Sequence, residues 1–221
     1  MKMTGNTILI TGGTSGIGLG LALRLHEAGN KVIVAGRRKE LLDRITSEHP
    51  GIEALVLDVA DPASIARAAE SAATSHPQLN LLVNNAGIML PENLLDPASL
   101  PVAEDHVTVN LLGTIRMTYA FLPLLEDKSD AVVMNVTSAL AFVPLPITPT
   151  YNATKAALHS FSEMNTKSPP HGSSPPGSTW CDGCPEPTSS RGVHITRRER
   201  RGGIRGSPSV RDRLAVPGPG C

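Results

Sequence analysis

Residues 6–29 read NTILITGGTSGIGLGLALRLHEAG and combine three local signals that decide the fold. Residues 6–11 are mostly apolar or β-branched, which favours a buried strand. A glycine-rich stretch follows. Ile17, Leu21 and Leu25 then recur at helical spacing, and Gly29 suits the position just after a helix. We therefore predict a strand, a tight turn and a helix at 17–29.

The same alternation continues along the chain to residue 163. Apolar runs predict strands at 31–36, 52–59, 79–87 and 130–138, and amphipathic stretches predict helices at 39–48, 61–75, 102–125 and 151–163. Asp61 is the expected N-cap and Pro62 the first residue of the third helix. Apolar strands separated by helices indicate a parallel sheet covered on both faces. The prediction is a doubly wound α/β fold of Rossmann type, with three layers, α/β/α.

The glycine-rich stretch itself, TGGTSGIG at 11–18, points to a phosphate-binding turn. Gly12, Gly16 and Gly18 permit a tight turn, a close approach of the backbone to a pyrophosphate, and close packing of helix on strand. The helix that follows presents free N–H groups and a partial positive charge at its start. We predict that a dinucleotide binds here.

Four further motifs follow in order: NNAG at 84–87, Asn110 within a helix, Ser138 at the end of a strand, and YNATK at 151–155. Together with the spacing TGxxxGxG, they make residues 5–163 resemble the short-chain dehydrogenase/reductase family. The resemblance implies an oxidoreductase that interconverts an alcohol and a ketone or aldehyde by hydride transfer. It implies a catalytic set of Ser138, Tyr151, Lys155 and Asn110, the last binding a water in a proton relay.

The chemistry explains why these residue types suit the reaction. Reducing a carbonyl requires a general acid within about 3 Å of its oxygen, and Tyr151 is the candidate. A cation within about 4 to 6 Å of a phenol favours the phenolate. Lys155 lies one helical turn later and therefore on the same helix face. By resemblance, Lys155 also bonds the nicotinamide ribose, and Ser138 donates to the substrate oxygen, where charge develops.

The end of the second predicted strand indicates which dinucleotide binds. An NAD enzyme usually places an acidic residue there for the ribose 2′-hydroxyl, but this chain has Arg37 and Arg38, which suit a 2′-phosphate. We favour NADP over NAD, and over the reading of both arginines as solvated surface charge. Asp58 and Val59 are expected to border the adenine. The predicted cofactor-binding residues are Thr11, Gly12, Thr14, Ser15, Gly16, Ile17, Gly18, Arg37, Arg38, Asp58, Val59, Asn85, Ala86, Gly87, Tyr151 and Lys155.

The composition changes abruptly at Met164, so we divide the chain into a catalytic domain at 1–163 and a tail at 164–221. The formal net charge is −5 (11 basic, 16 acidic) over the first segment and +5 (9 basic, 4 acidic) over the second. The tail is rich in Gly, Pro, Ser and Arg and too poor in apolar residues to offset its ordering entropy. We expect it to be disordered, and the fold to be truncated after the helix at 151–163, with one edge of the fifth strand bare.

Three interpretations of the tail stand beside one another. The preferred one is an altered reading of the coding DNA, by a frameshift, a retained intron or another exon; translating the other two frames beyond codon 164 tests it. The second is a basic tail that binds nucleic acid through RRERRGGIRG at 197–206, which we consider a weak case because the tail has no repeated unit. The third is a metal site formed by Cys181, Cys184, Cys221, His171 and His194, which is also weakly supported. We expect no metal cofactor.

Two functions from different classes therefore remain open. The first is an NADP-dependent oxidoreductase that acts on a small-molecule carbonyl or alcohol, with weak or absent turnover because the family's sixth and seventh strands, which form one wall of the nicotinamide site, are not readable. The second is a noncatalytic or poorly folded remnant that at most binds dinucleotide. All three cysteines and the one tryptophan lie beyond residue 163, and no run reaches the roughly 18 apolar residues of a membrane span. We expect a cytoplasmic protein without a membrane partner. The resemblance implies a homodimer or homotetramer, paired through the helices at 102–122 and 151–163.

Overall fold

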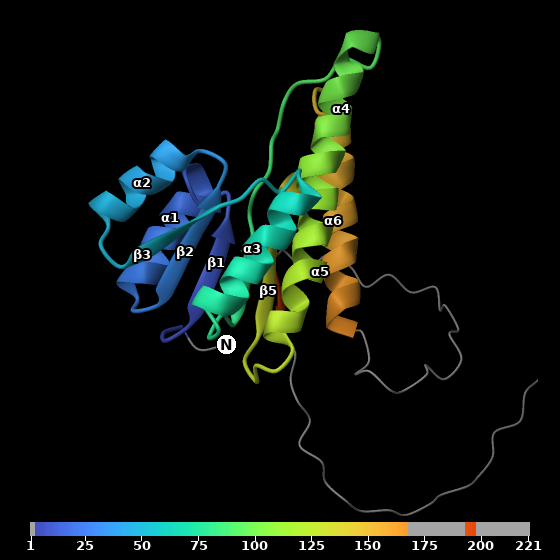
Figure 1. Cartoon of the computed structure of the whole chain (residues 1–221). Helices are drawn as coiled ribbons and strands as arrows, with labels where there is room; N and C mark the ends of the chain where they lie inside the picture. The colour runs from blue at the N-terminus through green and yellow to red at the C-terminus, as the bar shows by residue number, and fades with distance from the viewer. Residues whose placement is uncertain (1–2, 168–192, 198–221) are drawn as a thin grey trace, which may run out of the picture.

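A computed structural model describes residues 3–167 and 193–197 of the chain (Figure 1). Its sheet has the strand order β3-β2-β1-β4-β5-β6, and the strands from β1 to β5 all pair in parallel. The doubly wound parallel sheet predicted from the sequence is confirmed. The strands are β1 (Thr7–Thr11), β2 (Lys31–Gly36), β3 (Ile52–Val56), β4 (Leu81–Asn84), β5 (Val132–Val136) and β6 (Val193–Arg197).

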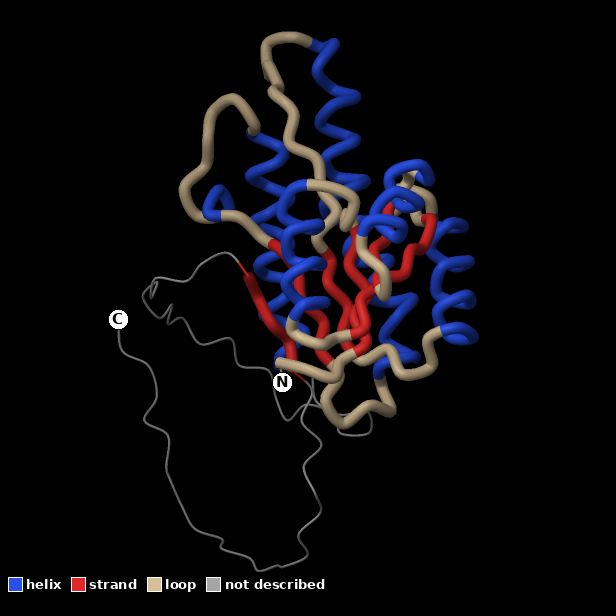
Figure 2. The backbone as a smooth tube through the Cα atoms, turned by 90° about the vertical axis from the view of Figure 1, so that its left-hand side faces the viewer, coloured by secondary structure: helices blue, strands red, loops and turns tan. Residues whose placement is uncertain are grey.

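Helices cover both faces of this sheet (Figures 1 and 2). Successive residues of β1 point to opposite faces. Leu9 joins a buried cluster with side chains of α3 (Pro62–Ser75) and α5 (Thr114–Leu125). Ile8 and Ile10 join a second cluster with α1 (Gly16–Glu27) and α2 (Lys39–Glu48). All five residues of β1 are buried, as expected for a central strand enclosed by two helical layers.

The helix predicted at 17–29 starts and ends as the sequence signals suggested. It is α1, and Gly29, just beyond its end, adopts φ 84°, a left-handed conformation that glycine tolerates best. The predicted cap of the third helix is also confirmed, because Asp61 Oδ1 accepts a 2.8 Å hydrogen bond from the Ala63 amide. Local signals were therefore sufficient at these two helix ends.

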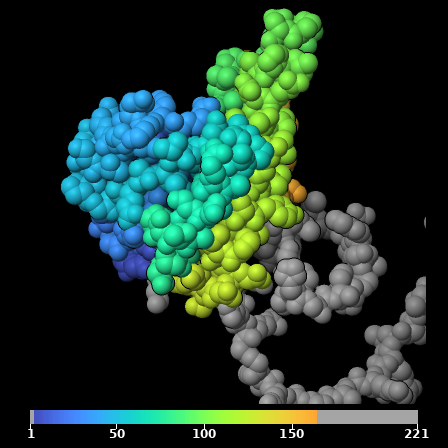
Figure 3. Space-filling view, in the orientation of Figure 1, coloured from blue at the N-terminus to red at the C-terminus, as the bar shows by residue number. Residues whose placement is uncertain are grey.

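The single helix predicted at 102–125 is divided in the structure. A short 3₁₀ turn, η1 (Pro97–Ser99), leads into α4 (Leu100–His106), then a π-helical segment, η2 (Val107–Gly113), and then α5. Residues 107–109 are all β-branched and Gly113 has no side chain, so this stretch has low α-helix propensity. Tertiary contacts can therefore set its hydrogen-bond pattern. α4, η2 and α5 follow one another as one continuous segment, whose α4 end projects beyond the rest of the molecule (Figure 3).

The strands end earlier than the apolar runs predicted. β3, β4 and β5 stop at Val56, Asn84 and Val136, whereas the predicted ends were 59, 87 and 138. The residues that follow β4 and β5 leave the ladder to form loops at the carboxyl edge of the sheet. After β5, this loop includes the 3₁₀ turn η3 (Ala139–Ala141) and leads to α6 (Pro149–Lys167). Ligands of open α/β sheets bind at this edge.

Two expectations about the C-terminal part are wrong. The helix predicted to stop at about residue 163 continues as α6 to Lys167. The edge of β5 is not bare, because β6 pairs with it in antiparallel orientation, with Met134 opposite Ile195. A run containing Val193, Ile195 and Thr196 has high strand propensity, which the average composition of the tail concealed. An exposed strand edge offers free backbone groups for such pairing.

Within the described ranges, no helix combines the length and apolar character needed to cross a bilayer. The same part of the chain has no group of three His, Cys, Asp or Glu side chains arranged to hold a metal ion. The predictions that involve Cys181, Cys184, Cys221, His171 and the arginine-rich run beyond 197 lie outside the described residues, and so does the side chain of His194.

Candidate active site

The glycine-rich turn between β1 and α1 packs closely against the loop that follows β4. Gly12 adopts φ 66°, and a Cβ atom added there would lie 2.8 Å from the Ala86 Cα. A Cβ at Gly18 would lie 2.3 Å from the Gly12 carbonyl oxygen and 2.4 Å from Asn85 Nδ2. These two positions therefore require glycine for packing. Gly16 differs, because its φ of 55° requires glycine although the space beside it is open.

A cleft lies above this turn, at the carboxyl edge of β1, β2, β3 and β4. Most of the predicted cofactor-binding residues line it. They are Gly12, Thr14, Ser15, Ile17, Gly18, Arg37, Arg38, Asp58, Val59, Asn85, Ala86 and Gly87. The sequence analysis missed five more lining residues, Ala35, Gly36, Leu57, Ile88 and Val109. Three of them, Gly36, Leu57 and Ile88, adjoin predicted residues at strand ends, and that adjacency was the only available signal.

Thr11 does not line the cleft but supports its floor. It is 1% exposed, and its Oγ1 accepts 3.0 Å hydrogen bonds from the backbone amides of both Asn85 and Ala86. The same hydroxyl donates to the Val83 carbonyl at 3.3 Å. Asn85 Nδ2 donates to the carbonyls of Thr11 and Gly12. Side chains at the ends of β1 and β4 thus hold the two loops together.

The part of the cleft next to the end of β2, which we call its far end, carries two positive charges. Arg38 Nη2 lies 3.4 Å from Thr14 Oγ1, so the second predicted arginine reaches across to the glycine-rich turn. Arg37 and Arg38 both line the cleft and are exposed, and Arg38 directly precedes α2. Asp58 closes its own turn instead, because its Oδ1 accepts from the Ala60 amide at 2.9 Å. An anion entering this end of the cleft would meet the two guanidinium groups.

Tyr151 and Lys155 lie one turn apart at the start of α6, as their spacing predicted. The Lys155 Nζ is 5.7 Å from the centroid of the Tyr151 ring and donates a 2.8 Å hydrogen bond to the Val136 carbonyl at the end of β5. Lys155 is only 5% exposed, and this burial lowers its pKa from 10.5 to about 8. A buried ammonium therefore lies beside a half-buried phenol.

Gly87 lies between the cleft and the side chains of Lys155 and Asn110. It lines the cleft, and a Cβ atom added there would lie 3.8 Å from Lys155 Nζ and 3.1 Å from Asn110 Oδ1. Asn110 is fully buried in η2, where its Oδ1 accepts from the Ile88 amide and its Nδ2 donates to the Ile88 carbonyl, both at 2.8 Å. The structure thus brings Tyr151, Lys155 and Asn110 together. It assigns the Asn110 amide to holding the backbone of the loop after β4.

Ser138, the fourth predicted catalytic residue, lies two residues beyond the carbonyl that binds Lys155. It is half-buried in extended backbone, and its Oγ accepts from the Leu140 amide at 3.2 Å, capping the η3 turn. Since the Oγ acts as acceptor in this bond, the hydroxyl keeps a proton that it can donate to a ligand. The sequence predicted that Ser138 follows the fifth strand, but it did not predict that the side chain caps η3.

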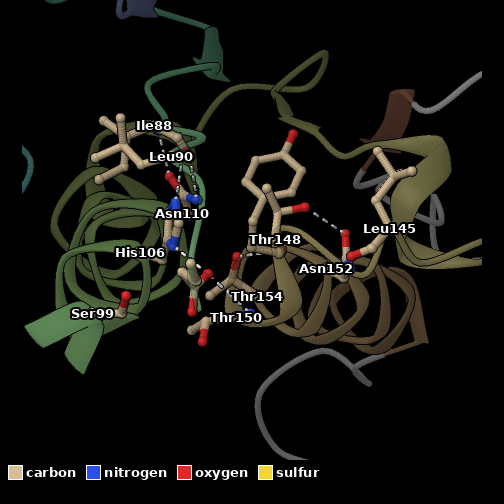
Figure 4. A network of polar contacts seen from close by, with 12 residues as sticks. Ile88, Leu90, Ser99, His106, Asn110, Leu145, Thr148, Thr150, Asn152 and Thr154 are labelled. Carbon is tan, nitrogen blue, oxygen red and sulfur yellow. Dashed lines mark hydrogen bonds and ion pairs between the residues drawn. The ribbon is translucent and has the colours of Figure 1, made fainter. Parts of the chain in front are cut away.

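Sequence reasoning missed a buried polar pair beside Tyr151. Figure 4 shows His106 on the same helical segment as Asn110, near Ile88 and Leu90. His106 Nδ1 lies 2.9 Å from Glu92 Oε1, although the two atoms are not aligned as a hydrogen bond. The His106 ring packs edge-on to the Tyr151 ring, with centroids 6.0 Å apart. The spacing of His106 and Asn110, four residues apart, was the only hint in the sequence that they share a helix face.

Similar proteins agree with this architecture. A solved structure of 3-ketoacyl-(acyl-carrier-protein) reductase from Brucella melitensis, complexed with NADH, matches with a TM-score of 0.69 at 32% identity, over 75% of this chain and 71% of that one. A short-chain dehydrogenase from Streptomyces avermitilis matches with a TM-score of 0.69 at 30% identity, over 74% of this chain and 60% of that one.

Curated sequences give the same result. The uncharacterized oxidoreductase DltE of Bacillus subtilis (strain 168) is 45% identical over 163 residues, which are 73% of this chain and 65% of that protein. An uncharacterized oxidoreductase of Staphylococcus aureus (strain USA300) is 29% identical, over 73% of this chain and 70% of its own length. The chain thus spans about two thirds of the length of these relatives. The family model described as short chain dehydrogenase matches residues 6–169, and the chain therefore belongs to the short-chain dehydrogenase family.

Proposed function

We propose that this chain binds NADP(H) and, with it, interconverts an alcohol and a ketone or aldehyde. The observation that carries the proposal is the position of Gly87, which lines the cleft and lies beside both Lys155 and Asn110. The glycine-rich turn suits a pyrophosphate, because nothing lies within 4 Å of a Cβ position at Gly16, which leaves the backbone there uncovered. Ser15 does not cap the first turn of α1, so N–H groups there can bind an anion.

The preference for NADP rests on charge at the far end of the cleft. Both Arg37 and Arg38 line it, and the residues at the end of β2 include no acidic side chain to bind a ribose 2′-hydroxyl. A guanidinium group forms paired, charge-assisted hydrogen bonds with phosphate. The arginines would therefore bind the 2′-phosphate that distinguishes NADP from NAD.

Each catalytic side chain then has a defined role. The bound nicotinamide would supply the hydride. Tyr151 would donate the proton to the substrate oxygen, and Lys155 would stabilise the resulting phenolate and bond the ribose. Ser138 would donate a hydrogen bond to the same oxygen, where negative charge develops. Asn110 would keep the loop after β4 in place beside Lys155. The substrate in this proposal is a small-molecule carbonyl or alcohol.

A single-turnover assay tests the proposal and detects slow chemistry. Excess protein is mixed with NADPH and a panel of small ketones and aldehydes, and the nicotinamide absorbance is followed. We expect absorbance to be lost with at least one carbonyl, and Tyr151→Phe to slow this loss by about 100-fold or more, while NADPH binding stays unchanged. Binding of NADPH without any turnover would instead support the noncatalytic remnant. A protein that does not bind NADPH would refute the proposed function and leave only a remnant that lacks coenzyme binding as well.

A further inference from the structure

Two buried titratable side chains, Glu92 and His106, lie beside Tyr151, and none of the chemistry above uses them. The side chains of Glu92 and His106 are 1% and 0% exposed, and Glu92 Oε1 lies 2.9 Å from His106 Nδ1. His106 ends α4, whereas Glu92 belongs to the loop after β4. Two groups so costly to remove from water call for a role specific to their position.

His106 holds the loop after β4 from one side. Its Nε2 accepts a 3.0 Å hydrogen bond from the Leu90 amide, so the neutral ring carries its proton on Nδ1, facing Glu92. Four residues later, Asn110 bonds both backbone groups of Ile88. Figure 4 shows both side chains directed at this loop. The loop is therefore attached to α4 and η2 at two successive points.

Glu92 attaches the same loop to the first turn of α6. Its Oε1 accepts a 3.1 Å hydrogen bond from the Thr150 amide, and its own amide donates to the Ile147 carbonyl at 2.9 Å. Thr150 is the second residue of α6, so its N–H has no partner within the helix. A carboxylate there also interacts favourably with the helix dipole. The next residue along the helix is Tyr151.

His106 makes a second contact with that turn, since its ring packs edge-on to the phenol ring with centroids 6.0 Å apart. Lys155 Nζ lies 5.7 Å from the centroid of the same ring. The orientation of Tyr151 thus depends on Glu92 through the backbone and on His106 through the ring. One pair of side chains bridges α4, the loop after β4 and α6.

Stability alone explains this pair poorly. Glu92 Oε2 is buried and has no hydrogen-bond partner among the described residues, and a buried polar pair that leaves one oxygen unsatisfied is a weak stabiliser. We propose that Glu92 and His106 are positioning residues, which fix the first turn of α6 so that the Tyr151 phenol keeps its orientation beside Lys155. The effect of this positioning on catalysis rests on the proposed function above.

The kinetic test compares Glu92→Ala with two matched variants. Glu92→Gln keeps an oxygen that can accept from Thr150, and Glu53→Ala alters a different Glu–His contact, the 3.6 Å pair with His76 between β3 and the end of α3. We expect Glu92→Ala to slow the single-turnover rate by about 10- to 100-fold at saturating NADPH, with NADPH affinity unchanged. Glu92→Gln should restore most of the rate, and Glu53→Ala should match the parent.

A second variant separates positioning from loss of folding. Glu92→Leu/His106→Phe removes both polar groups at once, which avoids leaving one of them buried without a partner. We expect this double variant to unfold cooperatively and to bind NADPH, yet to be as slow as Glu92→Ala. A double variant that keeps the parent rate would overturn the proposal.

A spectroscopic test does not depend on turnover. The chain has two tyrosines, and Tyr119 is 71% exposed, so Tyr119→Phe leaves Tyr151 as the only phenol. In that background, near-ultraviolet circular dichroism reports whether the Tyr151 ring is held in one orientation. We expect Glu92→Ala and the double variant to lose this tyrosine signal and Glu92→Gln to keep it. An unchanged tyrosine signal in both variants would refute positioning, whether or not the parent protein binds NADPH. A parent that neither binds NADPH nor turns over would refute only the proposed function.

Discussion

Lys155 and Val136 are joined by a 2.8 Å hydrogen bond from the lysine ammonium to the last carbonyl of β5, and this bond holds the ammonium beside the Tyr151 ring. The position excludes water from Lys155, which is 5% exposed, and lowers its pKa from 10.5 to about 8. The protein therefore keeps a cation where burial opposes it. The burial that serves the proposed chemistry therefore lowers the stability of the folded protein while Lys155 is charged.

The first prediction concerns pH and stability at Lys155. Below pH 8 the lysine is protonated both folded and unfolded, and the unfavourable burial of its charge is fully present. Between about pH 8 and 10.5 the unfolded chain binds the proton that the folded chain has released, so the free energy of unfolding should rise with pH. The pKa shift corresponds to a rise of about 3 kcal/mol in the free energy of unfolding across this pH range.

Denaturant unfolding of the parent and of Lys155→Met across this pH range measures the effect. We expect the difference between the two proteins to shrink as the pH rises, because the variant lacks the titrating group. The variant should also be the more stable of the two near neutral pH. A difference that does not change with pH would contradict the burial of a charged lysine.

The second prediction concerns coenzyme choice. Replacing Arg37 or Arg38 by alanine should weaken NADPH binding by about 10- to 100-fold, because each removes a charge-assisted bond to the 2′-phosphate. NADH binding should change little. Titration of both coenzymes measures this, with Arg44→Ala as the control, since it makes the same charge change on α2 outside the cleft. Equal losses for both coenzymes would argue against recognition of the 2′-phosphate.

The third prediction uses two glycines of one helix. Gly18→Ala should destabilise the protein by about 1–3 kcal/mol and abolish dinucleotide binding, because its Cβ would lie 2.3 Å from the Gly12 carbonyl oxygen. Gly20→Ala should instead stabilise by about 0.5–1 kcal/mol, since nothing lies within 4 Å of its Cβ position. Thermal melts with and without NADPH measure both. Similar behaviour of the two variants would contradict the close packing at Gly18.

The fourth prediction concerns the floor of the cleft. Thr11→Val keeps the shape of the side chain but leaves the amides of Asn85 and Ala86 without their acceptor. We expect a loss of about 1–3 kcal/mol in the free energy of unfolding and weaker NADPH binding. Thr11→Ser retains the hydroxyl and should recover most of both. If serine behaves like valine, the hydroxyl is not what joins the two loops.

Local sequence patterns were enough to predict the sheet, the helices on its two faces and most of the cleft. Strands such as β1 are apolar throughout, and helix ends at Asp61 and Gly29 carry their own signals. Residues at strand ends gather at one edge of a parallel sheet, so Gly12, Arg38 and Asn85 could be assigned to one site without coordinates. The four-residue spacing of Tyr151 and Lys155 placed them on one helix face.

The remaining features depend on contacts between residues far apart in the chain. Nothing near Glu92 in the sequence indicates that its carboxylate reaches Thr150, 58 residues later, or lies against His106. The pairing of β6 with β5 and the π-helical segment at 107–113 are likewise settled between elements. Periodicity specifies which face of an element is buried, but only the packed fold sets which polar groups meet there, because each must find its partner among whatever the topology brings near. The sequence therefore determined the scaffold and its cofactor turn, whereas tertiary packing decided how Lys155 is desolvated and what surrounds Tyr151.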